Sequence, residues 1–478
     1  MLLTAWSAAS KSRKRHKYRN LLRLGVISTS FTQPPSVNLG MWMSLLLLSG
    51  VLSLLSSYAN AGNNGLALTP QMGWNTWNHF GCDISEATIL NSAKAMIANN
   101  LPQLGYNYVL MDDCWQAPAR DPTTGAPVAD PQKFPNGIKD LSDQIHNMSL
   151  KFGIYSSAGV YTCGGKFGSL GFETIDAQTY AEWGVDYLKY DNCYNEGLAG
   201  TPRISFERYA NMSRALNATG RPILYSMCNW GEDGPWNFAS TIANSWRISG
   251  DIYDNFDRYD DRCPCTSMLD CKLAGFHCAM ARIIDFAAPL GQKAHQGAWN
   301  DLDMLEVGNG GMTFDEYVTH FSFWSILKSP LILGNDITNM TEETLSIITN
   351  KAVIALNQDP AGSPASRIWK VPLKGGGDIS LWTGSLVNSQ WVIAVLNTSP
   401  KTVSWDIEFS DVFIDYGKSA QQDSWVLTDL WQKDDSGNWG KNLGTFKGKV
   451  KGVKVAAHQT KLWLAVPASM VKRDIQEL

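Results

Sequence analysis

Charged, polar and aromatic residues, most of them aspartates, tryptophans or tyrosines, mark the ends of a series of short apolar runs along this sequence. They are Trp74, Trp77, Asp112, Asp113, Tyr155, Lys189, Asp191, Asn229, Trp230, Arg247, Asp251, Asp301, Asp303 and Asp336. Carboxylates accept hydrogen bonds from hydroxyl groups, and tryptophan or tyrosine rings pack on C–H patches, so this set suits a sugar. Two acids can also flank a glycosidic bond as nucleophile and general acid.

Two of these acids lie close to a cation. Lys189 and Asp191 are two residues apart, so on one strand both side chains point to the same face. Arg247 precedes Asp251 by four residues. A nearby ammonium lowers the pKa of a carboxylate and keeps it ionised, as a nucleophile requires. We therefore expect Lys189 to hold Asp191 in its charged form.

Eight apolar runs, each followed by a helix-like stretch, must position these side chains. They lie at residues 72–77, 106–115, 151–159, 185–193, 222–230, 245–252, 297–305 and 329–336. Strands alternating with helices predict parallel βαβ units, and eight units in about 270 residues predict a (β/α)8 TIM barrel with its active site at the carboxyl ends of the strands. A doubly wound open sheet is the alternative, but no Gly-x-Gly-x-x-Gly follows the first run.

An aspartate after a strand is often only the N-cap of the next helix. We assign Asp301 and Asp336 to this structural role. A metal-dependent barrel hydrolase could also use an aspartate cluster, but the strand ends carry no histidine. The sequence therefore predicts neither a metal nor a cofactor.

The pattern changes after residues 357–360. Segments such as 379–384, 390–397 and 460–466 alternate with period two between clusters of Gly, Ser, Asn and Asp. They predict a smaller antiparallel β domain, a sandwich with a structural role. We expect three regions: an N-terminal extension with a signal peptide (1–61), the catalytic barrel (62–360) and the antiparallel β domain (361–478).

The N-terminal region differs in charge from the rest of the chain. Residues 1–61 hold seven Lys or Arg and no acid, which leaves 33 of the 40 basic residues against all 44 acidic ones. An acidic body argues against a nucleic-acid partner. The apolar run 42–55 is short for a membrane span and is followed by Ala59-Asn60-Ala61, a signal-peptidase pattern with cleavage before Gly62. We expect a secreted, extracellular protein without a stable membrane partner; an uncleaved anchor is the alternative.

Secretion determines how the nine cysteines are interpreted. Four lie within sixteen residues, and an oxidising compartment favours local disulfides over zinc there: Cys263, Cys265, Cys271 and Cys278. The other candidates for pairing are Cys82, Cys114, Cys163 and Cys193. Cys228 lies inside an apolar run and is expected to be a buried free thiol. Five Asn-x-Ser/Thr sequons suit a secreted glycoprotein: Asn147, Asn211, Asn217, Asn339 and Asn397.

At these residues the sequence resembles the α-galactosidases of glycoside hydrolase family 27, particularly the secreted fungal ones. The matching stretches are LALTPQMGWNTWNHFGC (66–82), YVLMDDCW (108–115), FGIYSSAG (152–159), WGVDYLKYDNC (183–193), SGDIYDNFD (249–257), GAWNDLDMLEVGNGG (297–311) and ALNQDPAG (355–362). The resemblance extends more loosely over the C-terminal domain. The four-cysteine stretch looks like the fungal subgroup, and the forty leading residues have no counterpart in the family pattern.

The resemblance implies a retaining double displacement that removes terminal non-reducing α-D-galactosyl residues from galacto-oligosaccharides and other galactosides. Asp191 matches the family nucleophile and Asp251 the acid/base. Asp112 and Asp113 match the pair that binds the hydroxyls at C4 and C6, with Asp113 in reach of Lys189.

The resemblance also implies further sugar contacts. Lys189 would bridge O3 and O4, and Arg247 would lie by O2 and the acid/base. Trp77 and Tyr155 would line the sugar, and Asp303 matches a position at the rim.

The same resemblance implies a disulfide framework. It pairs Cys82 with Cys114 and Cys163 with Cys193. It also pairs the 263–278 cluster within itself and leaves Cys228 single.

Substrate preference within the family depends on the region around C2. Relatives that take N-acetylgalactosamine have small residues there, whereas Cys228-Asn229-Trp230 looks crowded and favours galactose. The alternatives are α-N-acetylgalactosaminidase or β-L-arabinopyranosidase activity, action on isomaltose-type linkages, or a sugar-binding protein that has lost catalysis. Intact Asp191 and Asp251 argue against the last.

Overall fold

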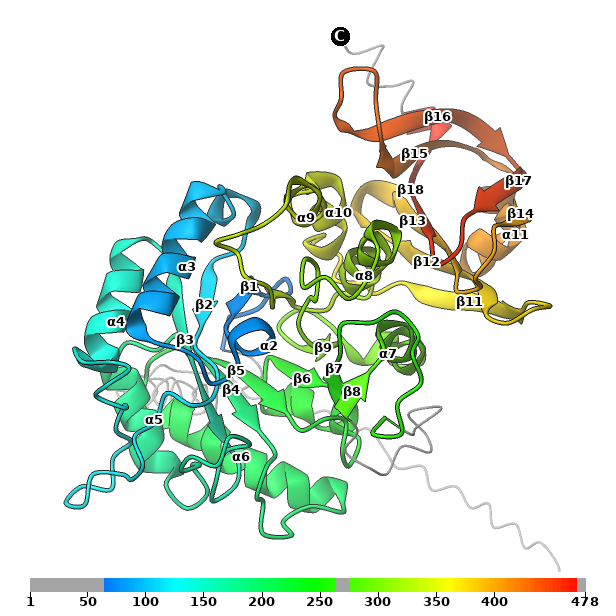
Figure 1. Ribbon diagram of the computed structural model, residues 1–478. Helices are drawn as coiled ribbons and strands as arrows, with labels where there is room; N and C mark the ends of the chain where they lie inside the picture. Colours follow the sequence, from blue (N-terminus) through cyan, green and yellow to red (C-terminus); the bar gives the residue numbers. More distant parts are fainter. Residues whose placement is uncertain (1–63, 264–275, 471–478) are drawn as a thin grey trace, which may run out of the picture. The chain divides into compact units, whose positions relative to one another are not determined.

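The computed structural model describes residues 64–263 and 276–470 (Figure 1). Eight parallel strands form one curled sheet in the order β10-β1-β2-β3-β4-β5-β6-β9. They are β1 (Met72–Asn75), β2 (Tyr108–Leu110), β3 (Lys151–Ser157), β4 (Tyr187–Asp191), β5 (Leu224–Cys228), β6 (Ser245–Arg247), β9 (Trp299–Asp301) and β10 (Leu331–Leu333). A parallel bridge joins Leu305, just after β9, to Leu333 of β10. The predicted TIM barrel and its eight strand positions are confirmed.

Helices follow the strands and lie around this sheet (Figure 1). They are α3 (Glu86–Ala98), α4 (Gly137–Asn147), α5 (Glu173–Glu182), α6 (Pro202–Ala218), α7 (Met280–Ala287), α8 (Phe314–Ile326), α9 (Glu342–Ile348) and α10 (Lys351–Asn357). Side-chain caps fix some of their N-termini, such as those of α3 and α8: Ser85 accepts a hydrogen bond from the Thr88 amide, and Thr313 and Glu316 form a capping box on α8.

Strand periodicity directs the chemistry into the barrel. Tyr187, Lys189 and Asp191 alternate along β4, so they share one face. Tyr187 belongs to a buried apolar cluster with Tyr108, Leu110, Leu224, Met304 and Ile332, which come from strands around the barrel. This cluster is the floor of the site. The polar residues that follow on the same faces are therefore held above it, at the carboxyl ends of the strands.

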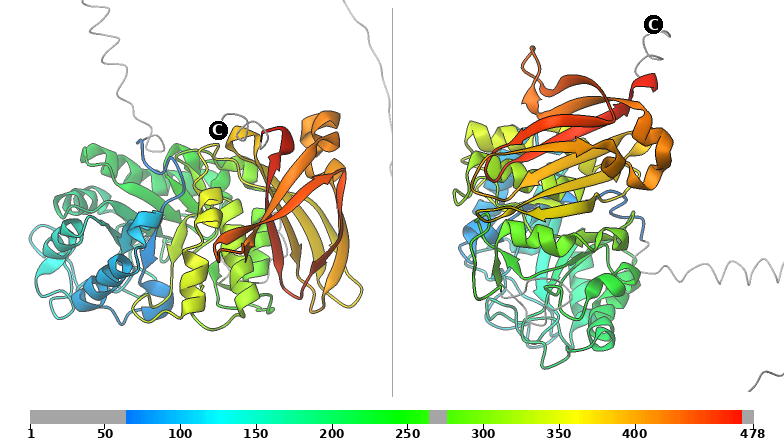
Figure 2. Two further views of the ribbon diagram at one scale, coloured as in Figure 1. Left: turned by 90° about the horizontal axis from the view of Figure 1, so that it is seen from above. Right: turned by 90° about the vertical axis from the view of Figure 1, so that its right-hand side faces the viewer.

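The C-terminal domain is an antiparallel β-sandwich, as predicted (Figure 2). Six strands form one sheet: β11 (Ser366–Pro372), β12 (Asp378–Ser385), β13 (Trp391–Asn397), β18 (Thr460–Pro467), β15 (Ser424–Lys433) and β16 (Trp439–Lys447). The remaining two, β14 (Val403–Glu408) and β17 (Lys449–Val455), pair with each other. The short helices α11 (Phe409–Val412) and α12 (Gly417–Gln422) follow β14.

The central strands β12 and β13 of the six-stranded sheet are buried on both faces. On β13, Ile393 and Val395 pack in the core of the sandwich, whereas Val392 and Ala394 belong to the core that includes α8 of the barrel. The Trp431 indole also donates a hydrogen bond to Ser322 Oγ of α8 (2.8 Å). The C-terminal domain is thus joined to the barrel through α8.

Three disulfides are present in the described residues, and they link Cys82 to Cys114, Cys163 to Cys193 and Cys263 to Cys278. The first two are the pairs that the family resemblance implies. Cys228 is free and buried, as expected. Cys265, Cys271 and the predicted signal peptide lie outside the described residues. Within the described part of the chain, no helix has the length and apolar character needed to cross a membrane.

One predicted glycosylation site is wrong. Asn397 is fully buried at the end of β13, and its Nδ2 donates hydrogen bonds to the carbonyls of Lys401, Val455 and Ala456. A folded chain therefore offers no room or free nitrogen for a glycan there. The other four sequons are exposed: Asn147, Asn211, Asn217 and Asn339.

Candidate active site

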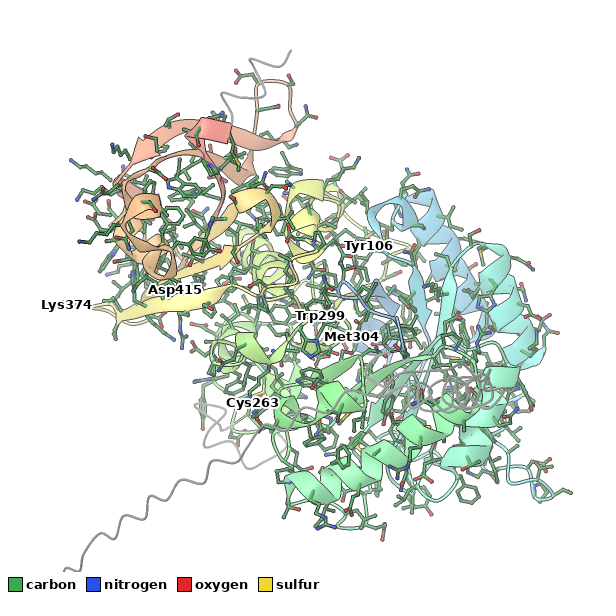
Figure 3. The ribbon with its side chains drawn as sticks, turned by 180° about the vertical axis from the view of Figure 1, so that it is seen from behind. Tyr106, Cys263, Trp299, Met304, Lys374 and Asp415 are labelled. Carbon is green, nitrogen blue, oxygen red and sulfur yellow. A yellow bond between two sulfur atoms is a disulfide. The ribbon has the colours of Figure 1, made fainter. Side chains whose placement is uncertain are left out.

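The carboxyl ends of the barrel strands surround a cavity of about 570 Å³. Nine of the predicted site residues line it: Trp77, Asp112, Asp113, Tyr155, Lys189, Asp191, Arg247, Asp251 and Asp303. Met304 also lines it and belongs to the apolar floor, among the side chains that fill the barrel (Figure 3). The barrel therefore brings together acids, cations and aromatic rings from six different strands or strand ends.

Asp191 is buried at the end of β4 and held by two hydrogen bonds. Its Oδ2 accepts from the Tyr155 hydroxyl (2.8 Å) and its Oδ1 from the Asn192 amide (2.8 Å). Burial raises the pKa of Asp191 to about 6, against the lowering influence of Lys189. Lys189 thus acts on the pKa of Asp191 in the expected direction, but the cost of burial outweighs the attraction of the ammonium. Asp191 is still mostly ionised at neutral pH.

Lys189 forms its own ion pair with Asp112 rather than with Asp191. Its Nζ lies 2.7 Å from Asp112 Oδ2, which also accepts a hydrogen bond from Asn75 Nδ2 (2.8 Å). Burial lowers the pKa of Lys189, but the charges around it, Asp112 first, raise it well above its usual range. Lys189 therefore stays charged, and the pair offers a donor and an acceptor together in the cavity.

Asp113 is held apart from this pair by the backbone. Its Oδ1 accepts from the Cys114 amide and its Oδ2 from the Gly164 amide, both at 2.7 Å. A Cβ at Gly164 would lie 2.8 Å from Cys114 Sγ, so only glycine fits beside the disulfide. Burial raises the pKa of Asp113, opposed by these hydrogen bonds. The ion pair of Lys189 is with Asp112, and the reach of Asp113 to Lys189 that the resemblance implies stays a prediction.

Asp251 begins the short strand β7 (Asp251–Ile252), which pairs with β8 (Phe276–Cys278). Its side chain is 48% exposed, and Arg247 Nη2 lies 3.1 Å from its Oδ1. Arg247 itself is buried, and the same Nη2 lies 2.8 Å from Asp303 Oδ2. One guanidinium nitrogen therefore joins an exposed and a buried carboxylate.

The matching family position suggested that Asp303 lies at the rim of the cavity, but the structure does not place it there. It is buried, and its carboxylate accepts hydrogen bonds from the amides of Ile252 and Met304, both at 2.8 Å. Burial raises its pKa, against the effect of Arg247. Its position beneath β7 fixes the backbone next to Asp251.

The N-cap assignments of Asp301 and Asp336 are wrong. Asp301 Oδ1 accepts a hydrogen bond from the Asp303 amide (2.9 Å). Asp301 also lines a small inner cavity of about 20 Å³, together with Lys189 and Arg247. Burial raises its pKa to about 6. Asp336 accepts from the amide and hydroxyl of Thr338, so it closes a local turn rather than capping a helix.

Asn229 and Trp230 do not line the cavity. Asn229 is fully buried and donates to the Glu232 carbonyl (2.9 Å), which places it in a turn after β5. Trp230 follows with a positive φ of 59°. The structure gives no support to the expectation that these two side chains crowd the sugar.

Sequence reasoning missed two residues of the site. Glu306 lines the cavity, accepts a hydrogen bond from Asn78 Nδ2 (2.6 Å), and has its pKa raised to about 8 by burial. Asn75 supports Asp112 from β1. Both residues lie inside the stretches that match the family. Neither has a lysine or arginine at the two- or four-residue spacing that drew attention to Asp191 and Asp251. The described residues hold no group of three or more Cys, His, Asp or Glu arranged to bind a metal ion.

Comparisons with known proteins agree with this geometry. A family model described as alpha galactosidase A matches residues 69–359, and one for the α-galactosidase C-terminal β-sandwich domain matches residues 376–465. Alpha-galactosidase mel1 of Schizosaccharomyces pombe is 52% identical over 415 residues, which cover 86% of this chain and 92% of that protein. An α-galactosidase of Lachancea cidri is 52% identical over 383 residues, covering 78% and 81%.

Solved structures give the same result. α-Galactosidase I of Mortierella vinacea matches with a TM-score of 0.80 and 54% identity, covering 85% of this chain and 98% of that one. The Saccharomyces cerevisiae α-galactosidase solved with raffinose matches with a TM-score of 0.82 and 42% identity, covering 85% and 99%. The family that the sequence motifs indicated is thereby confirmed, and this chain belongs to the α-galactosidase family of glycoside hydrolases.

Proposed function

We propose that this chain hydrolyses terminal α-D-galactosides with retention of configuration, using Asp191 as the nucleophile and Asp251 as the acid/base. One observation carries the assignment: both carboxylates line the same cavity in contrasting surroundings. Asp191 is buried and aimed by two donors, whereas Asp251 is half exposed beside Arg247. A nucleophile needs a fixed, ionised oxygen, and an acid/base must exchange protons with water.

The reaction follows in two displacements. Asp191 attacks the anomeric carbon as the bond to the leaving oxygen breaks, and Asp251 gives its proton to that oxygen. Asp251 then takes a proton from water, whose oxygen attacks the same carbon and releases Asp191. Two inversions give net retention.

Galactose selectivity would come from the group of side chains at the base of the cavity. Lys189 and Asp112 present a donor and an acceptor together, and Asp113 lies next along the chain. Each would bind hydroxyls of the sugar, and the axial O4 distinguishes galactose from glucose. The substrates are galacto-oligosaccharides and other α-galactosides. The family resemblance puts Arg247 by O2, and Arg247 Nη2 lies 3.1 Å from Asp251 Oδ1, which supports galactose over N-acetylgalactosamine as the sugar.

Secretion is part of the proposal. Three disulfides in the described residues support an oxidising compartment, because such bonds persist mainly outside the cytosol. The apolar run and Ala-Asn-Ala pattern before Gly62 support an export signal.

The stereochemical test uses 4-nitrophenyl α-galactoside and early proton NMR of the released sugar. We expect α-galactose first, since the second displacement restores the configuration; initial β-galactose would refute a covalent Asp191 intermediate. Asp191→Asn should lose activity on every galactoside. Asp257→Asn, a change in the same loop as Asp251 but outside the cavity, is the matched control and should keep full activity.

A further inference from the structure

The C-terminal domain touches the loop that carries Asp251. The contact comes from the turn 456–459 between β17 and β18. There the His458 ring stacks on Phe256, with ring centroids 4.2 Å apart and planes 12° from parallel. Phe256 is buried and lies five residues after Asp251 in the same loop. A side chain from one domain thus packs directly against the loop of the proposed acid/base in the other.

The same turn also holds the start of α8. His458 Nδ1 lies 2.6 Å from Glu316 Oε1, and the His458 carbonyl accepts from Thr319 Oγ1 (3.1 Å). Glu316 is the third residue of α8 and closes its capping box with Thr313. His458 therefore binds α8 by its ring and by its backbone, which fixes the ring that covers Phe256.

The start of α8 makes a second connection to the acid/base loop. Asp254, three residues after Asp251, accepts hydrogen bonds from the Tyr317 hydroxyl (3.0 Å) and the Gly311 amide (2.5 Å). Two routes thus lead from the turn 456–459 to the loop: Phe256 directly, and Asp254 through α8.

The Asp251 carboxylate, to which these two routes lead, has few direct contacts of its own. The Asp251 side chain is 48% exposed, and Arg247 is the partner that the structure gives it among the described residues. Its position therefore depends on the backbone of residues 251–257. On one side that backbone is fixed by Asp303 at the Ile252 amide. On the other side it is fixed by Phe256 and Asp254.

We propose that His458 is a positioning residue for the acid/base, so that the C-terminal domain takes part in catalysis by fixing the loop 251–257. This inference rests on the proposed role of Asp251. His458 touches neither the cavity nor the sugar, and it acts through Phe256 and Glu316. Loss of its ring frees one end of the loop, and small misplacements of a catalytic group cost large factors in rate.

The test compares two leaving groups. Melibiose leaves as an alkoxide and needs proton donation, whereas 2,4-dinitrophenyl α-galactoside leaves almost without it. We expect His458→Ala to lower kcat/KM for melibiose roughly tenfold and that for the dinitrophenyl substrate about twofold or less. A purely structural role would reduce the active fraction and lower both values equally.

Two further variants separate the contacts of His458. His458→Phe keeps the stack on Phe256 but is strained at the positive φ of 55° of this position, so its folding stability is measured beside its activity. His458→Asn keeps a donor for Glu316 and tolerates this φ. We expect the phenylalanine variant to retain most of the activity on melibiose and the asparagine variant to resemble His458→Ala. The matched control is Lys449→Ala, since the ion pairs of Lys449 with Asp406 and Glu408 stay inside the C-terminal domain. It should leave both substrates unaffected.

Asp251→Asn, measured in parallel, distinguishes the two proposals. It should show the same leaving-group preference in a stronger form. If Asp251→Asn shows none, the acid/base assignment fails. If Asp251→Asn shows the preference but His458→Ala and His458→Asn lose both activities equally, or lose neither, only the positioning role of His458 is overturned. The phenylalanine and asparagine variants give the same decision if His458→Ala fails to fold.

Discussion

Removing the Tyr155 hydroxyl is the most direct way to test how Asp191 is kept ionised. Tyr155 is buried, and its hydroxyl donates to Asp191 Oδ2 at 2.8 Å. Burial, followed by the charge of Asp191, raises the pKa of Tyr155 well above its usual range, so this hydroxyl stays a donor at every working pH. Tyr155→Phe deletes that one donor and keeps the ring, whose centroid lies 5.3 Å from Lys189 Nζ.

The sign of the effect follows from which form the hydrogen bond favours. Tyr155 donates to the charged carboxylate and so lowers its pKa, which burial has raised to about 6. Without the donor the pKa of Asp191 rises further. A hydrogen bond to a charged group contributes about 1.5–3 kcal/mol, and 1.36 kcal/mol corresponds to one pKa unit, so we expect a rise of about one to two units.

The assay is the pH dependence of kcat/KM, which reports groups of the free enzyme. If Asp191 is the nucleophile, as proposed, it must be ionised, so activity should fall as the pH drops through its pKa. We expect the acid limb of Tyr155→Phe to lie about one to two pH units higher, which is an additional loss of about ten- to fortyfold at pH 5 relative to pH 8. Tyr161→Phe, at an exposed tyrosine outside the cavity, is the control and should match the wild type. An unmoved acid limb, or one moved to lower pH, would refute the reasoning.

Three more outcomes are expected. Asp251→Asn should keep far more glycosylation of activated aryl galactosides than of melibiose, and azide should restore turnover by attacking the β-linked intermediate to give α-galactosyl azide; β-galactosyl azide would exchange the roles of the two acids. Asp303→Asn leaves the buried Arg247 short of a carboxylate and should lower the free energy of unfolding in urea by about 3 kcal/mol; an unchanged midpoint would contradict the buried pair. Thiol labelling of denatured, unreduced protein should mark Cys228, which burial keeps inert in the folded chain; a label within 263–278 would contradict the disulfide framework.

The barrel and most of the site could be predicted because parallel strands leave a strong pattern. Each strand is a short buried apolar run, and the chemistry stands where the run ends. Period two places Lys189 and Asp191 on one face of β4, and the structure has both lining the cavity. The same rule applied after β9 would have placed Asp301 and Asp303 inward together, and the N-cap assignment of Asp301 overlooked it.

Partners across strands could not be predicted in this way. Spacing along β4 shows that Lys189 and Asp191 share a face, but not that Asp112 comes closer to the ammonium from β2. Burial is likewise a property of the fold, and it decides the pKa of Asp191. The sequon at Asn397 fails for the same reason. Three residues specify the motif, but access of a glycan depends on where the asparagine lies in the fold, and Asn397 is buried in a strand that pairs on both sides.

The aspartates of the cavity share one chemical group, so their roles must come from their surroundings. Asp112 is neutralised by an ammonium, Asp113 is fixed by two backbone amides, and Asp191 is aimed by a phenol and an amide. Asp303 is buried against a guanidinium, and Asp251 alone among these five has a half-exposed side chain. Exposure lets Asp251 exchange protons with water, but it also removes the packing that fixes the other four. The proposed acid/base is therefore the group whose geometry depends most on distant support. Asp303 bonds to the loop 251–257 at the Ile252 amide, and His458 of the C-terminal domain stacks on Phe256 of the same loop.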